Sequence, residues 1–87
     1  MLNVAKLAIL IKYQWNFHRF TSQASEPEKE LMAGIDWDGL AELIHDLRRY
    51  HHKLVSKEYA AKIHVALLAA CADQATAQTL LGYASTL

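Results

Sequence analysis

The sequence has 87 residues, enough for one small domain, and 53% of them are hydrophobic. Its net charge is zero, whereas general nucleic-acid binders are usually strongly basic. The single cysteine, Cys71, excludes an internal disulfide and a cysteine-rich zinc site. We expect it to be an inert packing residue in a reducing compartment.

The charges are unevenly distributed along the chain. Residues 25–46 carry seven acids and one lysine, whereas residues 47–64 carry five bases and one acid. Such a polarised pattern suits electrostatic complementarity with a protein partner.

The N-terminal segment contains five consecutive apolar residues, Leu7 to Ile11. This run is too short for a signal peptide and far too short to cross a membrane. We therefore expect a cytoplasmic protein that is complete from its own Met1 and does not contact membranes.

The first predicted element is a helix over residues 2–21, which is apolar nearly all round. Within it, residues 9–18 also fit a strand, because Ile11, Tyr13, Trp15 and Phe17 alternate with polar residues. Nothing else in the chain resembles a strand, and a lone strand would have to pair across a dimer. We predict the helix and keep the strand as the alternative.

Two shorter signals follow. Ser25 and Glu28 form the capping-box pattern, with Pro27 in the first turn, and predict a helix over 26–33 that ends at Gly34. Asp36 then caps a third helix over 36–54.

The third predicted helix is amphipathic. Its apolar stripe at helical spacing consists of Trp37, Leu40, Ala41, Ile44, Leu47, His51 and Leu54. We therefore expect His51 in the core, as a satisfied histidine or as a pH-sensitive joint, and Trp37 as a core plug.

The fourth predicted helix begins after Ser56 and runs over 56–85, straight or bent near residues 71–73. It is apolar over most of its circumference, so it needs neighbours on more than one side. Its many alanines would suit a tight bundle or a dimer seam.

The five histidines raise the question of a metal. Glu42 and His45 have the spacing by which ferritin-like di-iron bundles present a carboxylate and an imidazole to one metal. Those bundles need that motif twice plus two further glutamates, and this chain has one copy. We expect exposed histidines and no cofactor, and keep a metal-binding helical bundle as the second alternative.

The stretch RRYHHKL, residues 48–54, ends the third helix with a cluster of bases. Arg48, Arg49, His52 and Lys53 would be available to an acidic partner or to phosphates. The simpler interpretation is complementarity with the helix dipole and a local pair between Asp46 and Arg49.

We expect no enzyme, because the chain has no glycine-rich phosphate loop, no nucleophile elbow and only three glycines. Trp15 and Phe17 lie in the segment that is apolar all round, and we expect a partner to bury them.

The sequence therefore predicts a single all-α domain, a small irregular bundle of four helices completed by dimerisation. The predicted function is non-catalytic binding of another protein, as an adaptor, a secretion-type chaperone or a small inhibitor or regulator of a larger assembly. The alternative is a small nucleic-acid-associated regulator that uses the basic end of the third helix.

Overall fold

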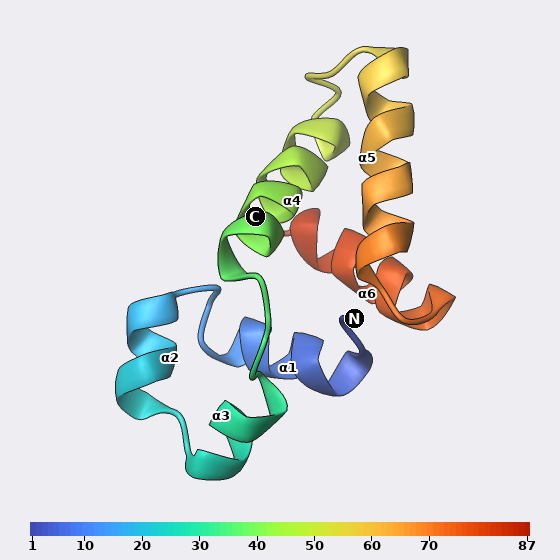
Figure 1. The fold of residues 1–87 in the computed structure, drawn as a ribbon. Coiled ribbons are helices and arrows are strands. Elements are labelled where there is room, and N and C mark those ends of the chain that lie inside the picture. The colour runs from blue at the N-terminus through green and yellow to red at the C-terminus, as the bar shows by residue number, and fades with distance from the viewer.

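The computed structural model describes all 87 residues, Met1–Leu87, and contains six helices and no strands. The helices are α1 (Val4–Lys12), α2 (Phe17–Gln23), α3 (Glu26–Leu31), α4 (Trp37–His51), α5 (Lys57–Ala70) and α6 (Gln74–Ala84). The predicted all-α class is confirmed, whereas the predicted count of four helices is too low (Figure 1).

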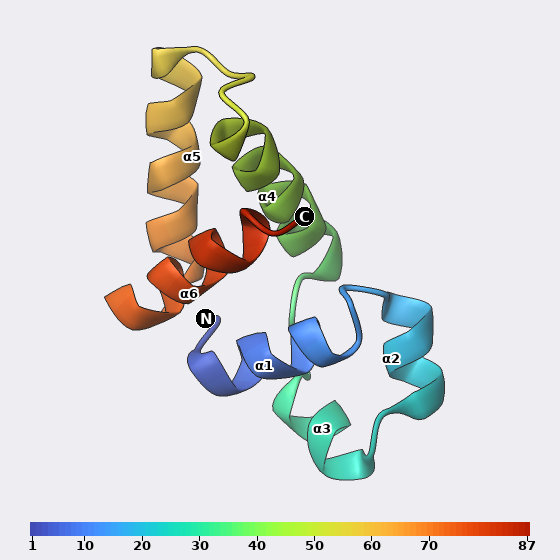
Figure 2. The ribbon, with the colours of Figure 1, turned by 180° about the vertical axis from the view of Figure 1, so that it is seen from behind.

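The helices form two unequal groups. α4 and α5 are an antiparallel pair, α6 packs against both of them, and α1 packs against α6. α2 and α3 form an arm on the far side of α1, away from α5 (Figure 2). The molecule is accordingly elongated, with extents of 42 × 22 × 18 Å.

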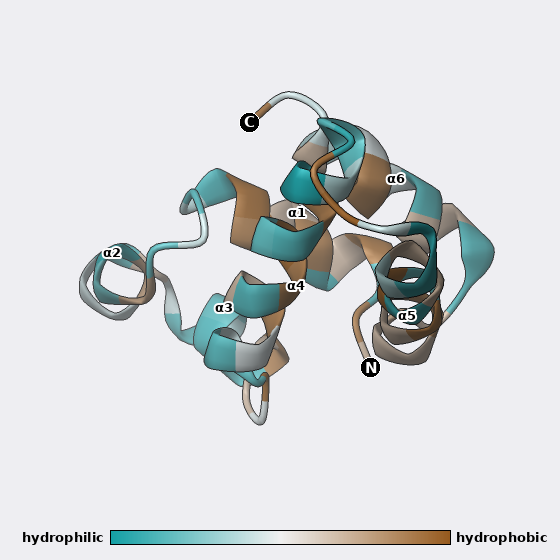
Figure 3. Cartoon of the chain, turned by 90° about the horizontal axis from the view of Figure 1, so that it is seen from above, coloured by the Kyte–Doolittle hydropathy of each residue, from teal (hydrophilic) through white to brown (hydrophobic).

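The core lies where α1, α4, α5 and α6 meet. Leu10 and Leu80 are completely buried, and Leu47 is 1% exposed. Burial of each such side chain contributes about 1.5–3 kcal/mol. α2 contributes only Phe20 to the core and α3 contributes nothing. Seen from above, α2 lies at the margin of the molecule (Figure 3).

The predicted helix over 2–21 is wrong in length, because the chain breaks between Lys12 and Phe17. Gln14 and Trp15 adopt left-handed conformations with φ of 55° and 60°. The N–H of Trp15 donates to the carbonyl of Leu10 at 2.9 Å, which is the bond that closes a Schellman motif. The strand alternative for 9–18 is also wrong, since helices occupy both ends of that range.

The helix after this break, α2, starts with its own cap. The side chain of Asn16 accepts the backbone N–H of Arg19 at 3.0 Å, which satisfies one of the free donors at the start of α2. Tyr13 is buried next to Phe20, with ring centroids 5.6 Å apart. The break therefore lets an aromatic-rich segment bury side chains in two directions.

The predicted helix over 56–85 is likewise two helices, and the bend considered near 71–73 is a complete break. Asp73 caps α6 by accepting both the N–H and the hydroxyl of Thr76, each at 2.7 Å. These two bonds lower the pKa of Asp73. Cys71 is extended and buried, as expected for a packing residue, and burial and then the charge of Asp73 raise the pKa of its thiol.

The break at Cys71 is fixed by the N-terminus. The N–H of Leu2 donates to the carbonyl of Ala70 at 2.9 Å, and the N–H of Ala72 donates to the carbonyl of Leu2 at 2.7 Å. This short parallel bridge joins the first residues of the chain to the connection between α5 and α6. No local sequence pattern predicts such a contact.

α3 and α4 agree better with the helices predicted from the sequence. Ser25 and Glu28 form the predicted capping box, and Leu40, Ile44 and Leu47 are buried as predicted. The prediction that His51 and Leu54 lie in the core is wrong, because both are exposed. α4 ends at His51, and Lys53, at a φ of 59°, turns the chain away.

We predict that Gln14→Gly raises the free energy of unfolding by about 0.5 kcal/mol, since glycine adopts the left-handed conformation without the steric cost of a Cβ. This gain exceeds the loss of the exposed hydrogen bond that the Arg19 guanidinium donates to Gln14 Oε1 at 2.8 Å. The matched control is Ala8→Gly, at an exposed position inside α1. There, glycine should lower the free energy of unfolding by about 1 kcal/mol. Urea unfolding of both variants measures the two changes, and two changes of the same sign would contradict the strained turn.

Candidate protein-binding surfaces

Apart from Trp15, the residues proposed for partner binding lie at the two ends of α4. Phe17 contacts Trp37 at its start, whereas Arg48, Arg49, His52 and Lys53 lie at or just beyond its last turn. A helix of 15 residues is about 22 Å long. The structure therefore does not bring these residues together into one site (Figure 1).

Phe17, from α2, and Trp37, from α4, form the aromatic surface. Phe17 is 49% exposed, and its ring centroid lies 5.4 Å from that of Trp37 in an edge-to-face arrangement. Beneath it, Phe20 lies 5.0 Å from Trp37 and is itself buried. Trp37 is half-buried, so it is a core plug that also contributes to the surface.

Trp15 does not belong to the aromatic surface. Its ring stacks on Tyr83 of α6, with centroids 6.2 Å apart and planes inclined by 21°. The indole N–H is buried and has no hydrogen-bond partner, although the whole side chain is only half-buried. Trp15 and Phe17 therefore do not share one surface.

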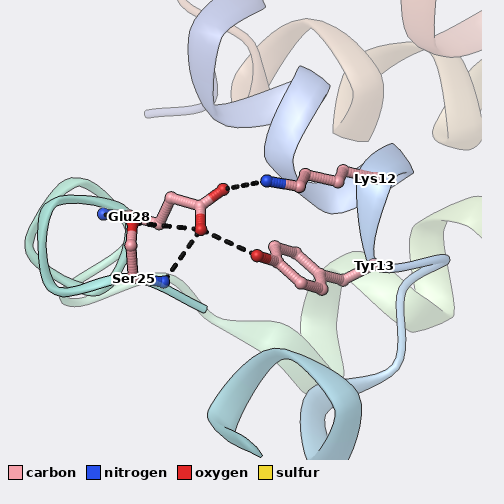
Figure 4. Close-up of polar contacts among 4 residues, drawn as sticks. All are labelled: Lys12, Tyr13, Ser25 and Glu28. Carbon is pink, nitrogen blue, oxygen red and sulfur yellow. Dashed lines mark hydrogen bonds and ion pairs between the residues drawn. The ribbon is translucent and has the colours of Figure 1, made fainter. Parts of the chain in front are cut away.

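Glu28 fastens the arm that carries Phe17. Its carboxylate accepts hydrogen bonds from the Tyr13 hydroxyl at 2.7 Å, the Ser25 N–H at 2.9 Å and the Lys12 ammonium at 2.9 Å (Figure 4). Lys12 and Tyr13 end α1, whereas Ser25 and Glu28 begin α3. This one side chain closes the loop of chain that contains all of α2.

The same contacts change the acidity of the groups involved. The Ser25 N–H, followed by Tyr13 and Lys12, lowers the pKa of Glu28 from 4.5 to about 2. Hydrogen bonding to Glu28 is in turn the main cause of the raised pKa values of Lys12 and Tyr13. Glu28 is therefore ionised throughout the physiological range.

Arg48, Arg49, His52 and Lys53 form the basic end of α4, and all four are exposed. None of them joins an ion pair; the two ion pairs of the structure are Lys12–Glu28 and Lys29–Glu26. Asp46 accepts a hydrogen bond from the Tyr59 hydroxyl at 3.3 Å instead of pairing with Arg49 as the spacing suggested. The cations remain available to an outside ligand.

The histidines are not gathered around a common point. No three side chains of histidine, cysteine, aspartate or glutamate are placed to hold a metal ion together. Glu42 and His45 are both exposed on α4. Glu42 and His45 have the spacing found in di-iron bundles, but the structure places no further ligand beside them to complete such a centre.

A further apolar surface lies on α5. The sequence alone did not indicate this surface. We call it the outer face of α5; it comprises Ala61, Val65, Leu68 and Ala69. Val65 is 68% exposed and Leu68 is 62% exposed, whereas Ile63 and Leu67 on the opposite side are buried. The signal in the sequence was that this helix is apolar over most of its circumference.

An open groove adjoins the outer face of α5. It has a volume of about 510 Å³ and lies between the end of α5, the start of α4 and the N-terminus. Its apolar lining consists mainly of Met1, Leu2, Ile35, Leu40, Leu43, Ala66, Ala69 and Ala70. Ala69 belongs to both surfaces, so the groove and the outer face are continuous.

Comparison with known proteins finds no matching family model, no similar curated protein and no similar solved structure. The six helices also include none that combines the length and the apolar character needed to cross a membrane.

We predict that Glu28→Gln lowers stability at neutral pH and weakens its dependence on acid. Because folding lowers the pKa of Glu28, its ionised form stabilises the fold fully above about pH 4.5. That contribution is lost as the pH falls towards about 2. Urea unfolding between these limits should therefore give a shallower pH slope for the variant.

The control is Glu30→Gln, because Glu30 is exposed and makes no side-chain hydrogen bond. Its pH slope should equal that of the wild type. A slope for Glu28→Gln that also equals the wild type would contradict the role of Glu28 in fastening the arm.

Proposed function

We propose that this protein is a non-catalytic module that binds another protein through the aromatic surface. The observation that carries the proposal is the position of Phe17, half-exposed on the rings of Trp37 and Phe20. Contacts of that kind fix the ring before a partner arrives, so little conformational entropy is lost on binding. Interfaces commonly depend on a few such aromatic anchors.

The surroundings of this anchor favour a partner with basic residues. Asp36 and Asp38 flank Trp37, and both are exposed. An apolar anchor with an acidic rim suits a segment in which an apolar side chain is followed by lysine or arginine.

The close polar contacts of the molecule support a non-catalytic role. The Glu28 cluster joins helix ends, and the side chains of Asn3, Asn16, Asp36, Ser56 and Asp73 cap helices. These groups are used to build the fold. An adaptor, a secretion-type chaperone or a small inhibitor or regulator of a larger assembly needs a stable surface rather than reactive groups.

The second candidate function is binding of a nucleic acid through the basic end of α4. It is favoured by one observation, that four exposed cationic or ionisable side chains lie together without an acidic partner. Such groups contact phosphates and release counterions, which makes the binding strongly dependent on salt.

We predict that Phe17→Ala abolishes binding of the protein partner, because the truncated side chain loses most of the contact area of the anchor. The measurement is affinity capture from cell extract at low and moderate salt, read by quantitative mass spectrometry. A capture that needs Phe17 should survive moderate salt. Leu54→Ala is the control, since Leu54 is 66% exposed beyond the other end of α4; equal losses with both variants would contradict the aromatic surface.

For the second function, we predict that reversing Arg49 and Lys53 to glutamate abolishes any affinity for duplex DNA or RNA. The affinity of the wild type should fall steeply with salt, because each phosphate contact releases a counterion. Fluorescence anisotropy with a labelled duplex measures both effects. Reversal of Lys29 to glutamate, on the exposed arm, serves as the control and should leave the affinity unchanged.

A further inference from the structure

The outer face of α5 is independent of the aromatic surface. Val65 and Leu68 are the most exposed large apolar side chains within any helix of the molecule. They lie three residues apart on one side of a helix, so they form one apolar ridge. No other helix covers this ridge, and α6 and α4 lie on the opposite side of α5, where Ile63 and Leu67 are buried.

Small residues flank the ridge on this face. Ala61 precedes the ridge, Val65 and Leu68 form it, and Ala69 follows it. A second α5 placed antiparallel, with a two-fold axis midway between residues 65 and 68, brings each Val65 opposite the partner's Leu68. The same axis places Ala61 opposite the partner's Ala72, so small residues lie at both ends of the ridge and let the two backbones approach closely. Interfaces between identical chains require this kind of self-complementary surface.

The charges along α5 distinguish an antiparallel from a parallel arrangement. Lys57, Glu58 and Lys62 give the start of the helix a positive charge, and the next charged residue along the chain is Asp73. An antiparallel pair brings Lys62 of one copy towards the end of the other α5, near Asp73. A parallel pair would place the two positive ends together. Antiparallel helices also oppose their dipoles favourably.

The area available decides whether the outer face alone is sufficient. A stable interface buries about 800 Å² per partner, which is about a seventh of the 5576 Å² surface of this chain. α5 has 14 residues and is about 21 Å long, so its outer face needs additional surface. The groove meets this face at Ala69 and extends round the flank of α5 through Ala66 to Met1, so it supplies apolar surface beside the ridge.

We propose that the outer face of α5 and the adjoining groove bind a second copy of this chain, with the two α5 helices antiparallel. The resulting dimer buries Val65, Leu68 and Met1. It leaves Phe17 and the basic end of α4 exposed, so two copies present two aromatic surfaces to other proteins. Self-association is thereby separate from the binding proposed above.

The first test is the solution mass across micromolar to millimolar concentrations, by light scattering and sedimentation equilibrium. The wild type should form a dimer at both low and high salt. Val65→Glu and Leu68→Glu should each weaken the dimer by at least tenfold, because each places a charge inside the apolar seam. Circular dichroism should show unchanged helicity, since both side chains are exposed in the single chain.

Leu54→Glu is the matched control, because it introduces the same charge at an apolar side chain that is 66% exposed. It should leave the dimer intact. A wild type that stays monomeric overturns the proposal, as does a dimer that tolerates glutamate at both 65 and 68. A monomer that binds a different protein through Val65 and Leu68 also overturns it.

The second test measures the relative direction of the helices. A nitroxide label on Lys57→Cys, in a Cys71→Ala background, should give label pairs about 30 Å apart in the antiparallel dimer, because residue 57 lies almost ten residues from the axis. A parallel pair would give a separation close to the interhelical distance of about 10 Å. The shorter distance would overturn the antiparallel arrangement.

The two proposals fail separately in these experiments. Phe17→Ala should leave the dimer unchanged, because Phe17 lies on α2 in the arm. Loss of dimerisation by this variant would overturn the separation of the two surfaces. Retention of a captured protein by Phe17→Ala would contradict the proposed function and leave the dimer proposal intact.

Discussion

The fold depends on the burial of α6. This helix packs against α1, α4 and α5, and it buries Thr76, Ala77, Leu80 and Ala84 completely or nearly so. Two of these residues are alanines, which allow neighbouring helices to approach closely. Because α1 has no comparable contact with α4 or α5, its position is determined chiefly by α6 and by the bridge at Leu2. Removal of α6 would leave the α4–α5 pair and the N-terminal half without a common core.

The sequence predicts those parts of the fold that are determined locally. Ser25, Asp36 and Ser56 each cap a helix where the pattern of residues places the cap. Asn16 and Asp73 are equally good capping residues, and they mark the two breaks that divide the longest predicted helices. The left-handed pair at Gln14 and Trp15 has no such signal, because neither residue is a glycine.

The candidate surfaces likewise divide into features that the sequence predicts and features that depend on the tertiary structure. The exposure of Arg48, Arg49, His52 and Lys53 agrees with the sequence, which places this cluster of bases at the end of an amphipathic helix. The separation of Phe17 from Trp15 was not predicted, since it depends on the break that sends one ring to Trp37 and the other to Tyr83. The outer face of α5 also required the structure. A helix that is apolar over most of its circumference predicts several neighbours, but periodicity cannot indicate which side the chain itself leaves uncovered.

The exposed apolar surfaces and the fastening of the arm have a common origin in the size of the chain. Only 17 of the 87 residues are buried, since a small domain has a high ratio of surface to volume. α2 and α3 lie outside the main core, so a polar cluster around Glu28 holds the arm in place of extensive apolar packing. α5, in contrast, carries more apolar surface than the core buries. A second copy packed on its outer face would enlarge that core, and the arm would remain free to present Phe17.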